Sequence, residues 1–111
     1  MIKMNKIKNI AIVGLGQIGI YLYNELNLKK KDIEIKTGIR INIVAISAKN
    51  YNKKRRFKIN KNIFYTNPLK IFKEKKLDIL FECIGQSDGI SKKIVETALK
   101  NKVNVITPNK A

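Results

Sequence analysis

The sequence of 111 residues contains no histidine, no tryptophan and a single cysteine. The absence of histidine excludes a Ser-His-Asp triad and any metal site ligated by imidazole. One cysteine cannot form an internal disulfide, and it leaves no cysteine cluster that could hold zinc. No apolar run approaches the roughly 18 residues that a membrane-spanning helix needs, so we expect no transmembrane segment.

Acidic residues are also scarce, because 8 Asp and Glu stand against 24 Lys and Arg, a formal net charge of +16. Such an excess can indicate a nucleic-acid or anionic-membrane partner. However, the 21 Lys, 20 Ile and 13 Asn residues share A- and T-rich codons, and the lysines are spread along the whole chain. We therefore interpret the charge as solvated surface and expect neither a nucleic-acid nor a membrane partner; a polyanion-binding surface is the alternative.

The length fits one domain, 1–111, and a hydrophobic content of 44% supports a folded chain with a core. The basic N-terminus followed by apolar Ile10–Val13 resembles the start of a signal peptide. Glycines then interrupt the apolar stretch, and no small-x-small cleavage site follows. We therefore expect a cytoplasmic protein.

Short apolar runs alternate with helical patterns along the chain. The expected strands are 8–13, 41–47, 63–65, 78–84 and 103–107; the expected helices are 17–28, 67–75 and 89–100. A charged connection, 29–40, and a very basic loop, 49–62, separate them. Strands that alternate with helices predict a parallel sheet with right-handed crossovers. The expected fold class is α/β, a Rossmann-like doubly wound sheet with strand order 3-2-1-4-5.

Two helices show an apolar face. In the first, Ile18, Leu22 and Leu26 recur every four residues with Tyr21 beside them, and we expect Tyr21 and Tyr23 to pack on this face. The corresponding residues of the last helix are Ile90, Ile94, Val95, Ala98 and Leu99.

A glycine-rich turn lies between the first strand and the first helix. Gly14-Leu15-Gly16-Gln17-Ile18-Gly19 matches G-x-G-x-x-G in the strand–turn–helix context that gives the pattern a mechanism. Gly14 allows the tight turn, Gly16 lets a pyrophosphate approach the backbone, and Gly19 lets the helix pack against the strand. The N–H groups that open the helix then face the phosphates. The alternative is a glycine turn that only packs.

The end of the second strand suggests which cofactor is bound. NAD-specific folds carry an acid there for the ribose hydroxyls, whereas this chain reads Ser47-Ala48-Lys49-Asn50. Further cations follow at Lys53, Lys54, Arg55 and Arg56. A cationic site without a carboxylate suits the 2′-phosphate of NADP. We therefore expect NADP(H) to be preferred, with NAD(H) as the alternative; ordinary solvated lysines would explain the same residues.

Several motifs occur together: IAIVGLGQIG in the first strand and turn, KTG before the second strand, SAKN after it, ECIGQSDG after the fourth, and VITPNKA at the end. Because of this combination of motifs, the chain resembles the N-terminal nucleotide-binding domain of homoserine dehydrogenase. The resemblance covers essentially all of the 111 residues. The resemblance implies an oxidoreductase that interconverts aspartate 4-semialdehyde and homoserine by hydride transfer with NADPH or NADH. This reaction lies on the route to threonine, methionine and isoleucine, and the parent enzyme is expected to be a homo-oligomer.

The resemblance also implies roles for individual residues. Lys110, the lysine of the T-x-N-K-A motif, would lie near the nicotinamide and the substrate, in substrate binding or proton transfer. Ile84 and Gly85, with Gln86, would pass along the cofactor. Pro108 stands where the family usually has alanine, and Lys49 where it commonly has arginine. A lysine beyond a central parallel strand could stabilise a forming oxyanion or donate a proton. The alternative is a solvated lysine with no role in the reaction.

Four further points complete the prediction. Cys83 is expected to be a small core residue, because no base accompanies it. Glu82 is unusual in an apolar strand and should face either a helix terminus or the site. The substrate-binding and dimerisation domain of the family is missing, so we expect a fragment that binds cofactor without turnover. The alternatives are the cofactor domain of another amino-acid or sugar dehydrogenase, and a non-enzymatic NADP-binding module.

Overall fold

A computed structural model describes residues 6–84 and 89–107 of the chain. They contain a five-stranded parallel sheet in the order β3-β2-β1-β4-β5. The strands are β1 (Lys6–Val13), β2 (Ile39–Ser47), β3 (Phe64–Tyr65), β4 (Ile79–Glu82) and β5 (Asn104–Ile106). The predicted fold class and strand order are therefore confirmed, and the strand bounds differ from the expected ones by one or two residues.

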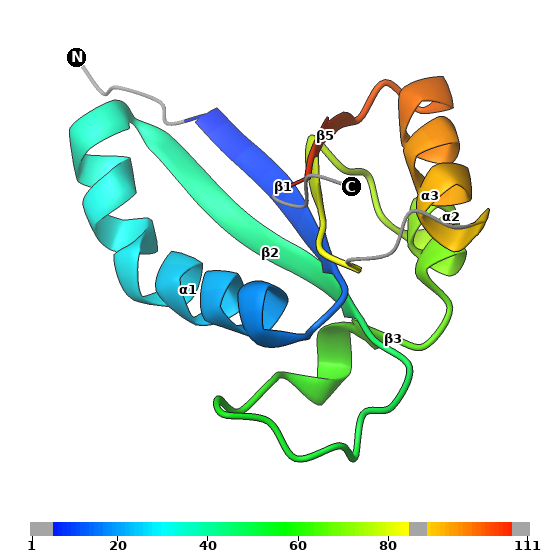
Figure 1. Ribbon diagram of the computed structural model, residues 1–111. Helices are drawn as coiled ribbons and strands as arrows, with labels where there is room; N and C mark the ends of the chain where they lie inside the picture. The colour runs from blue at the N-terminus through cyan, green and yellow to red at the C-terminus, as the bar shows by residue number, and fades with distance from the viewer. Residues whose placement is uncertain (1–5, 85–88, 108–111) are drawn as a thin grey trace.

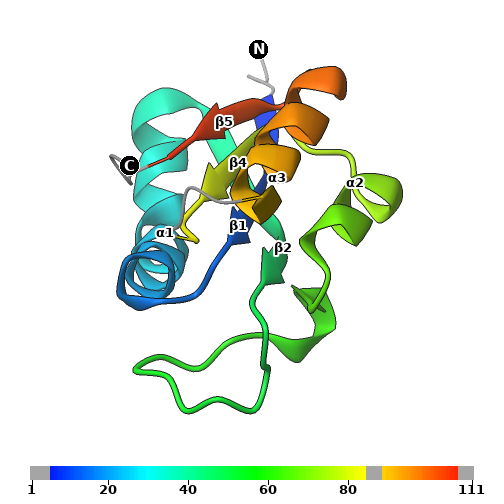
Figure 2. The same cartoon turned by 45° about the vertical axis from the view of Figure 1, so that its right-hand side comes forward.

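Helices cover both faces of the sheet. Helix α1 (Gln17–Thr37) lies on one face, whereas α2 (Ile71–Glu74) and α3 (Gly89–Lys100) lie on the other (Figures 1 and 2). Two short 3₁₀ turns, η1 (Lys61–Ile63) and η2 (Pro68–Lys70), precede β3 and α2. The expected helix 67–75 is thus divided into η2 and α2, and the Asn67 side chain caps it by accepting from the Leu69 N–H at 3.0 Å.

Helix α1 corrects the sequence prediction. It was expected to end near residue 28, followed by a charged connection over 29–40, but it continues to Thr37. Two i,i+4 ion pairs lie along this part, Glu25–Lys29 at 3.0 Å and Asp32–Lys36 at 3.1 Å. Such pairs and the high helix propensity of lysine support a helix whose exposed face carries little apolar signal. The charges therefore belong to the helix surface and not to a loop.

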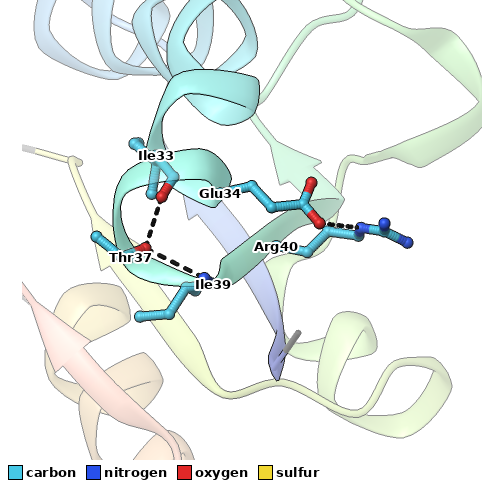
Figure 3. A network of polar contacts seen from close by, with 5 residues as sticks. All are labelled: Ile33, Glu34, Thr37, Ile39 and Arg40. Atoms are coloured by element: carbon cyan, nitrogen blue, oxygen red, sulfur yellow. Dashed lines mark hydrogen bonds and ion pairs between the residues drawn. The ribbon is translucent and has the colours of Figure 1, made fainter. Parts of the chain in front are cut away.

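The KTG segment is the C-terminal cap of this helix. Gly38 takes a left-handed conformation (φ 76°), and its N–H donates to the carbonyl of Glu34 at 2.8 Å. The Thr37 hydroxyl donates to the Ile33 carbonyl and accepts from the Ile39 N–H, so one side chain joins the last helical turn to β2 (Figure 3). Glu34 and Arg40 form an ion pair at 3.0 Å across the same junction (Figure 3).

Side chains of β1 alternate between two cores. Ile10 and Ile12 pack toward α1, in a cluster that contains Ile20 and Tyr23. Neighbouring Ala11 and Val13 belong to the opposite cluster, whose buried members are Ala45, Ile71, Leu77, Leu80, Ile94, Ala98 and Val103. Residues Ile10–Val13 are therefore buried on both faces of the sheet, as expected for a parallel strand between two helical layers.

The predicted helix faces are partly wrong. Ile18 and Tyr21 are about half exposed, at 49% and 57%, whereas Gly19, Ile20 and Tyr23 are buried. Because Gly19 packs closely on the turn before the helix, the face with Gly19, Ile20 and Tyr23 is turned toward the sheet. Of the two tyrosines expected to pack, only Tyr23 does so. In α3 the buried residues are Ser91, Ile94 and Ala98, while Ile90 and Leu99 are exposed.

Candidate functional site

The turn between β1 and α1 accepts only glycine at its first position. Gly14 has a φ of 95°, and its N–H donates to the carbonyl of Ser47 on β2 at 2.8 Å. A Cβ at this position would lie 2.7 Å from both the carbonyl carbon and the carbonyl oxygen of Cys83. The conformation and the packing therefore both require glycine, as expected for the tight turn of a phosphate-binding loop.

The other two glycines of the motif differ from each other. A Cβ on Gly19 would lie 2.9 Å from the carbonyl carbon of Gly14 and would overlap its carbonyl oxygen, so the helix packs on the turn. A Cβ on Gly16 would meet no atom of residues 6–84 and 89–107 within 4 Å. The space beside Gly16 is therefore open, and packing does not explain a glycine there. A ligand that approaches the backbone would explain it.

Among the residues that the structure describes, no side chain occupies the N-terminus of α1. Gly16 occupies the N-cap position, no side chain caps the helix, and its first turn contains no acidic residue. The first N–H groups of an α-helix, here those of Gln17, Ile18 and Gly19, have no partner within the helix. Together with the positive end of the helix dipole they form a site suited to phosphate.

This turn lies where the chain connections reverse direction. β1 and β4 are neighbours, and the Cys83 N–H donates to the Val13 carbonyl at 2.7 Å. The chain leaves β1 for α1 on one face and leaves β4 for α3 on the other (Figure 2). Ligands of open parallel sheets bind in the crevice at such a point, outside the carboxyl ends of the strands.

Glu82, the last residue of β4, has three hydrogen-bond partners in the described part of the chain. Its Oε2 accepts from the Ile84 N–H at 2.7 Å and from the Ser91 hydroxyl at 3.3 Å. Its Oε1 accepts from the Thr107 hydroxyl, also at 3.3 Å. The structure thus explains the acid that looked unusual in the sequence, because Glu82 contacts the N-terminal turn of α3, one of the two expected surroundings. The particular partners Ser91 and Thr107 were not anticipated. Nothing in the spacing of these residues could have indicated them.

The predicted 2′-phosphate site follows β2. Ser47 is buried, with 2% exposed, and Lys49 two residues later is exposed. Arg55 has a structural role, because its guanidinium donates to the carbonyls of Asn50, Tyr51 and Lys53 at 2.6, 3.1 and 3.2 Å. Among the cations predicted for this site, Lys49, Lys53, Lys54 and Arg56 are exposed. Residues 48–62 contain no carboxylate.

Cys83 is a core residue, as predicted. It is 7% exposed and belongs to the cluster under α1. Burial, with a smaller contribution from the charge of Glu82, raises the pKa of the Cys83 thiol to about 11. The thiol is therefore protonated at neutral pH and unsuited to nucleophilic chemistry.

Three predicted site residues, Gly85, Gln86 and Lys110, lie outside the described part of the chain, as does Pro108. Two surface hollows of about 410 and 560 Å³ lie at the opposite, amino end of the strands, beside Ile41 and Asp78 respectively.

Within residues 6–84 and 89–107, no group of three potential metal ligands comes together. No helix in these ranges has the length and apolar character required to cross a membrane.

The glycine turn, the uncapped helix N-terminus and the reversal between β1 and β4 define a dinucleotide-binding domain of the Rossmann type. The chain belongs to the homoserine dehydrogenase family, since the family model described as homoserine dehydrogenase, NAD binding domain, matches residues 14–111. A nicotinamide dinucleotide is therefore the cofactor for which this domain is built.

Individual relatives agree with this assignment. Homoserine dehydrogenase of Bacillus subtilis (strain 168) is 24% identical over 101 residues, which are 91% of this chain and 23% of that protein. A crystal structure of S. aureus homoserine dehydrogenase at pH 7.5 is 31% identical, with a TM-score of 0.86 over 94% of this chain and 26% of that one. A homoserine dehydrogenase structure from Thiobacillus denitrificans, 22% identical with a TM-score of 0.77, covers 97% of this chain and 25% of that chain and supports the fold alone. The chain thus spans about a quarter of the length of these relatives.

Proposed function

We propose that this chain is the cofactor-binding part of an enzyme that interconverts aspartate 4-semialdehyde and homoserine. The observation that carries the proposal is the turn at Gly14, Gly16 and Gly19. Two of these glycines are required by packing. The third, Gly16, lies at a helix N-terminus that no side chain caps, with no described residue within 4 Å of a Cβ there. A pyrophosphate on this turn would extend across the carboxyl ends of β1 and β4. When bound, the nicotinamide supplies or accepts the hydride.

The cofactor we propose is NADP(H) in preference to NAD(H). Support comes from the exposed Lys49 immediately beyond β2 and from the absence of any carboxylate in residues 48–62. A phosphate dianion on the ribose would be attracted by these cations, whereas free ribose hydroxyls would find no acidic acceptor there.

We further propose that Lys110 stabilises the oxyanion or transfers the proton when hydride reaches the aldehyde carbon. Support comes from its place in the sequence, three positions after Thr107 in the T-x-N-K-A motif of the family. Because the chain spans about a quarter of its relatives, we expect these 111 residues alone to bind cofactor without oxidising homoserine. The cytoplasmic location and the homo-oligomeric parent enzyme remain predictions.

Calorimetric titration with NADPH and NADH at near-physiological salt tests this proposal. We expect NADPH to bind more tightly than NADH, and Gly16→Val to abolish binding of both because its side chain fills the space beside the turn. Leu28→Val, at a residue 70% exposed on the far part of α1, is the control and should bind normally. Thermal unfolding of Gly16→Val must show a folded chain. Equal binding by Gly16→Val would mean that the net positive charge attracts phosphates nonspecifically, and it would overturn the dinucleotide site.

A further inference from the structure

The Glu82 carboxylate connects three segments at one end of the sheet. It is the last residue of β4 and is 7% exposed. Its Oε2 accepts a hydrogen bond from the N–H of Ile84, in the connection to α3, and a second from the hydroxyl of Ser91 in the first turn of α3. Its Oε1 accepts a hydrogen bond from the hydroxyl of Thr107, just beyond β5. Few side chains could satisfy three groups from three elements, which explains an acid at a buried strand end.

These three segments belong to one half of the dinucleotide crevice. A doubly wound fold consists of two mononucleotide-binding halves, and the pyrophosphate turn and the ribose-binding strand end lie in the first half, β1-β2-β3. The strands β4 and β5 form the second half, which receives the nicotinamide mononucleotide. Ile84 is the second residue after β4 and Thr107 the first after β5, so both lie at the carboxyl edge where that half must bind.

We propose that Glu82 is a positioning residue for the nicotinamide half of the cofactor. Its hydrogen bonds fix the backbone at Ile84 and the side chain of Thr107 relative to each other. The surface that would contact the nicotinamide half is therefore ordered before the cofactor binds. Preorganisation of this kind reduces the ordering cost of binding. The inference rests on the proposed function, because it presumes that the crevice takes a nicotinamide dinucleotide.

The role follows from hydrogen-bond geometry and not from the negative charge as such. In Glu82→Gln, the amide oxygen can still accept from Ile84 and Ser91. The amide nitrogen can donate to Thr107, whose hydroxyl turns from donor to acceptor. Glu82→Ala leaves all three groups without this partner. The two variants therefore separate a positioning role from a role in which the charge itself is needed.

The experiment compares two ligands on the same 111-residue chain: NADPH and 2′-phospho-ADP-ribose, which lacks only the nicotinamide. For Glu82→Ala we expect the Kd of NADPH to rise about tenfold, the effect of losing a hydrogen bond or two, while the Kd of 2′-phospho-ADP-ribose changes less than about twofold. Glu82→Gln should remain within about threefold of the parent chain for both ligands. Thr107→Val removes one donor without altering side-chain size, and it serves as the second variant should Glu82→Ala fail to fold; it should weaken NADPH selectively.

Three results with the variants overturn the Glu82 assignment. Equal weakening of both ligands would show a general structural role for Glu82, and unchanged NADPH binding would show no role. Selective loss in Glu82→Gln as large as in Glu82→Ala would show that the charge is required and would exclude the hydrogen-bond mechanism. If the parent chain binds neither ligand, the proposed function fails and the Glu82 assignment fails with it. If the parent chain binds both ligands, only the Glu82 assignment is at stake.

Discussion

Gly19 packs so closely on Gly14 that a Cβ added to Gly19 would lie 2.9 Å from the carbonyl carbon of Gly14 and would overlap its oxygen. The contact joins the first turn of α1 to the backbone that follows β1. It therefore fixes the direction in which the helix N-terminus points, and with it the position of the phosphate-binding N–H groups.

We expect Gly19→Ala to lower the free energy of unfolding by about 1–3 kcal/mol, since a methyl group must displace backbone and not a flexible side chain. Urea-induced unfolding measures this effect. Gly89→Ala is the matched control, because a Cβ there meets none of the described residues within 4 Å. The control should stay within about 0.5 kcal/mol of the parent chain. Equal stability of the two variants would contradict the packing described for Gly19.

The left-handed Gly38 at the end of α1 gives a second prediction. Gly38→Ala should lower stability by about 1 kcal/mol, because alanine is strained at a φ of 76°. Gly38→Asn should cost less, since asparagine tolerates this conformation better. The Kd of NADPH should be unchanged in both, because Gly38 precedes β2 and lies at the amino end of the strands. Equal destabilisation by Ala and Asn would argue against the cap.

Sequence patterns predicted the elements that a clear local pattern of residues encodes. They failed for the C-terminal part of α1, where that pattern is weak. The buried runs of β1 and β4 and the glycines between β1 and α1 indicated a parallel doubly wound sheet, and the order β3-β2-β1-β4-β5 confirms it. The last nine residues of α1, 29–37, were missed because charged residues such as Lys29 and Lys36 mask a weak apolar period. The spacing of Glu25 to Lys29 and the Thr37-Gly38 end were available signals that would have extended the helix.

The candidate site divides in the same way. Gly14 and Gly19 could be assigned from the motif, because each role follows from backbone geometry that the motif encodes. The bonds of Glu82 to Ser91 and Thr107 join residues 9 and 25 positions apart, and they depend on how α3 and β5 pack against β4. Tertiary contacts of this kind leave no periodic trace in a single sequence.

The buried thiol of Cys83 predicts a distinctive pH dependence. Its pKa is raised from 9.0 to about 11, so the folded state disfavours the thiolate. The stability that this neutral thiol contributes is fully present below pH 9 and is lost as the pH rises from about 9 to about 11. Unfolding measured between pH 8 and 11 should therefore fall less steeply in Cys83→Ala than in the parent chain, after the cavity cost of the variant is subtracted at pH 8. Parallel curves would contradict the shifted pKa.

Lys49 provides the test of cofactor choice. Lys49→Ala should raise the Kd of NADPH about fivefold to tenfold, because an exposed charge-assisted contact to the 2′-phosphate contributes about 1 kcal/mol. The Kd of NADH, which lacks that phosphate, should change less than about twofold. Lys100→Ala, at an exposed residue at the C-terminal end of α3, controls for the loss of one positive charge and should weaken neither cofactor. The selectivity should also diminish as salt is raised, since exposed charges are screened. Equal effects of Lys49→Ala on both cofactors, or a larger effect on NADH, would contradict a contact between Lys49 and the 2′-phosphate.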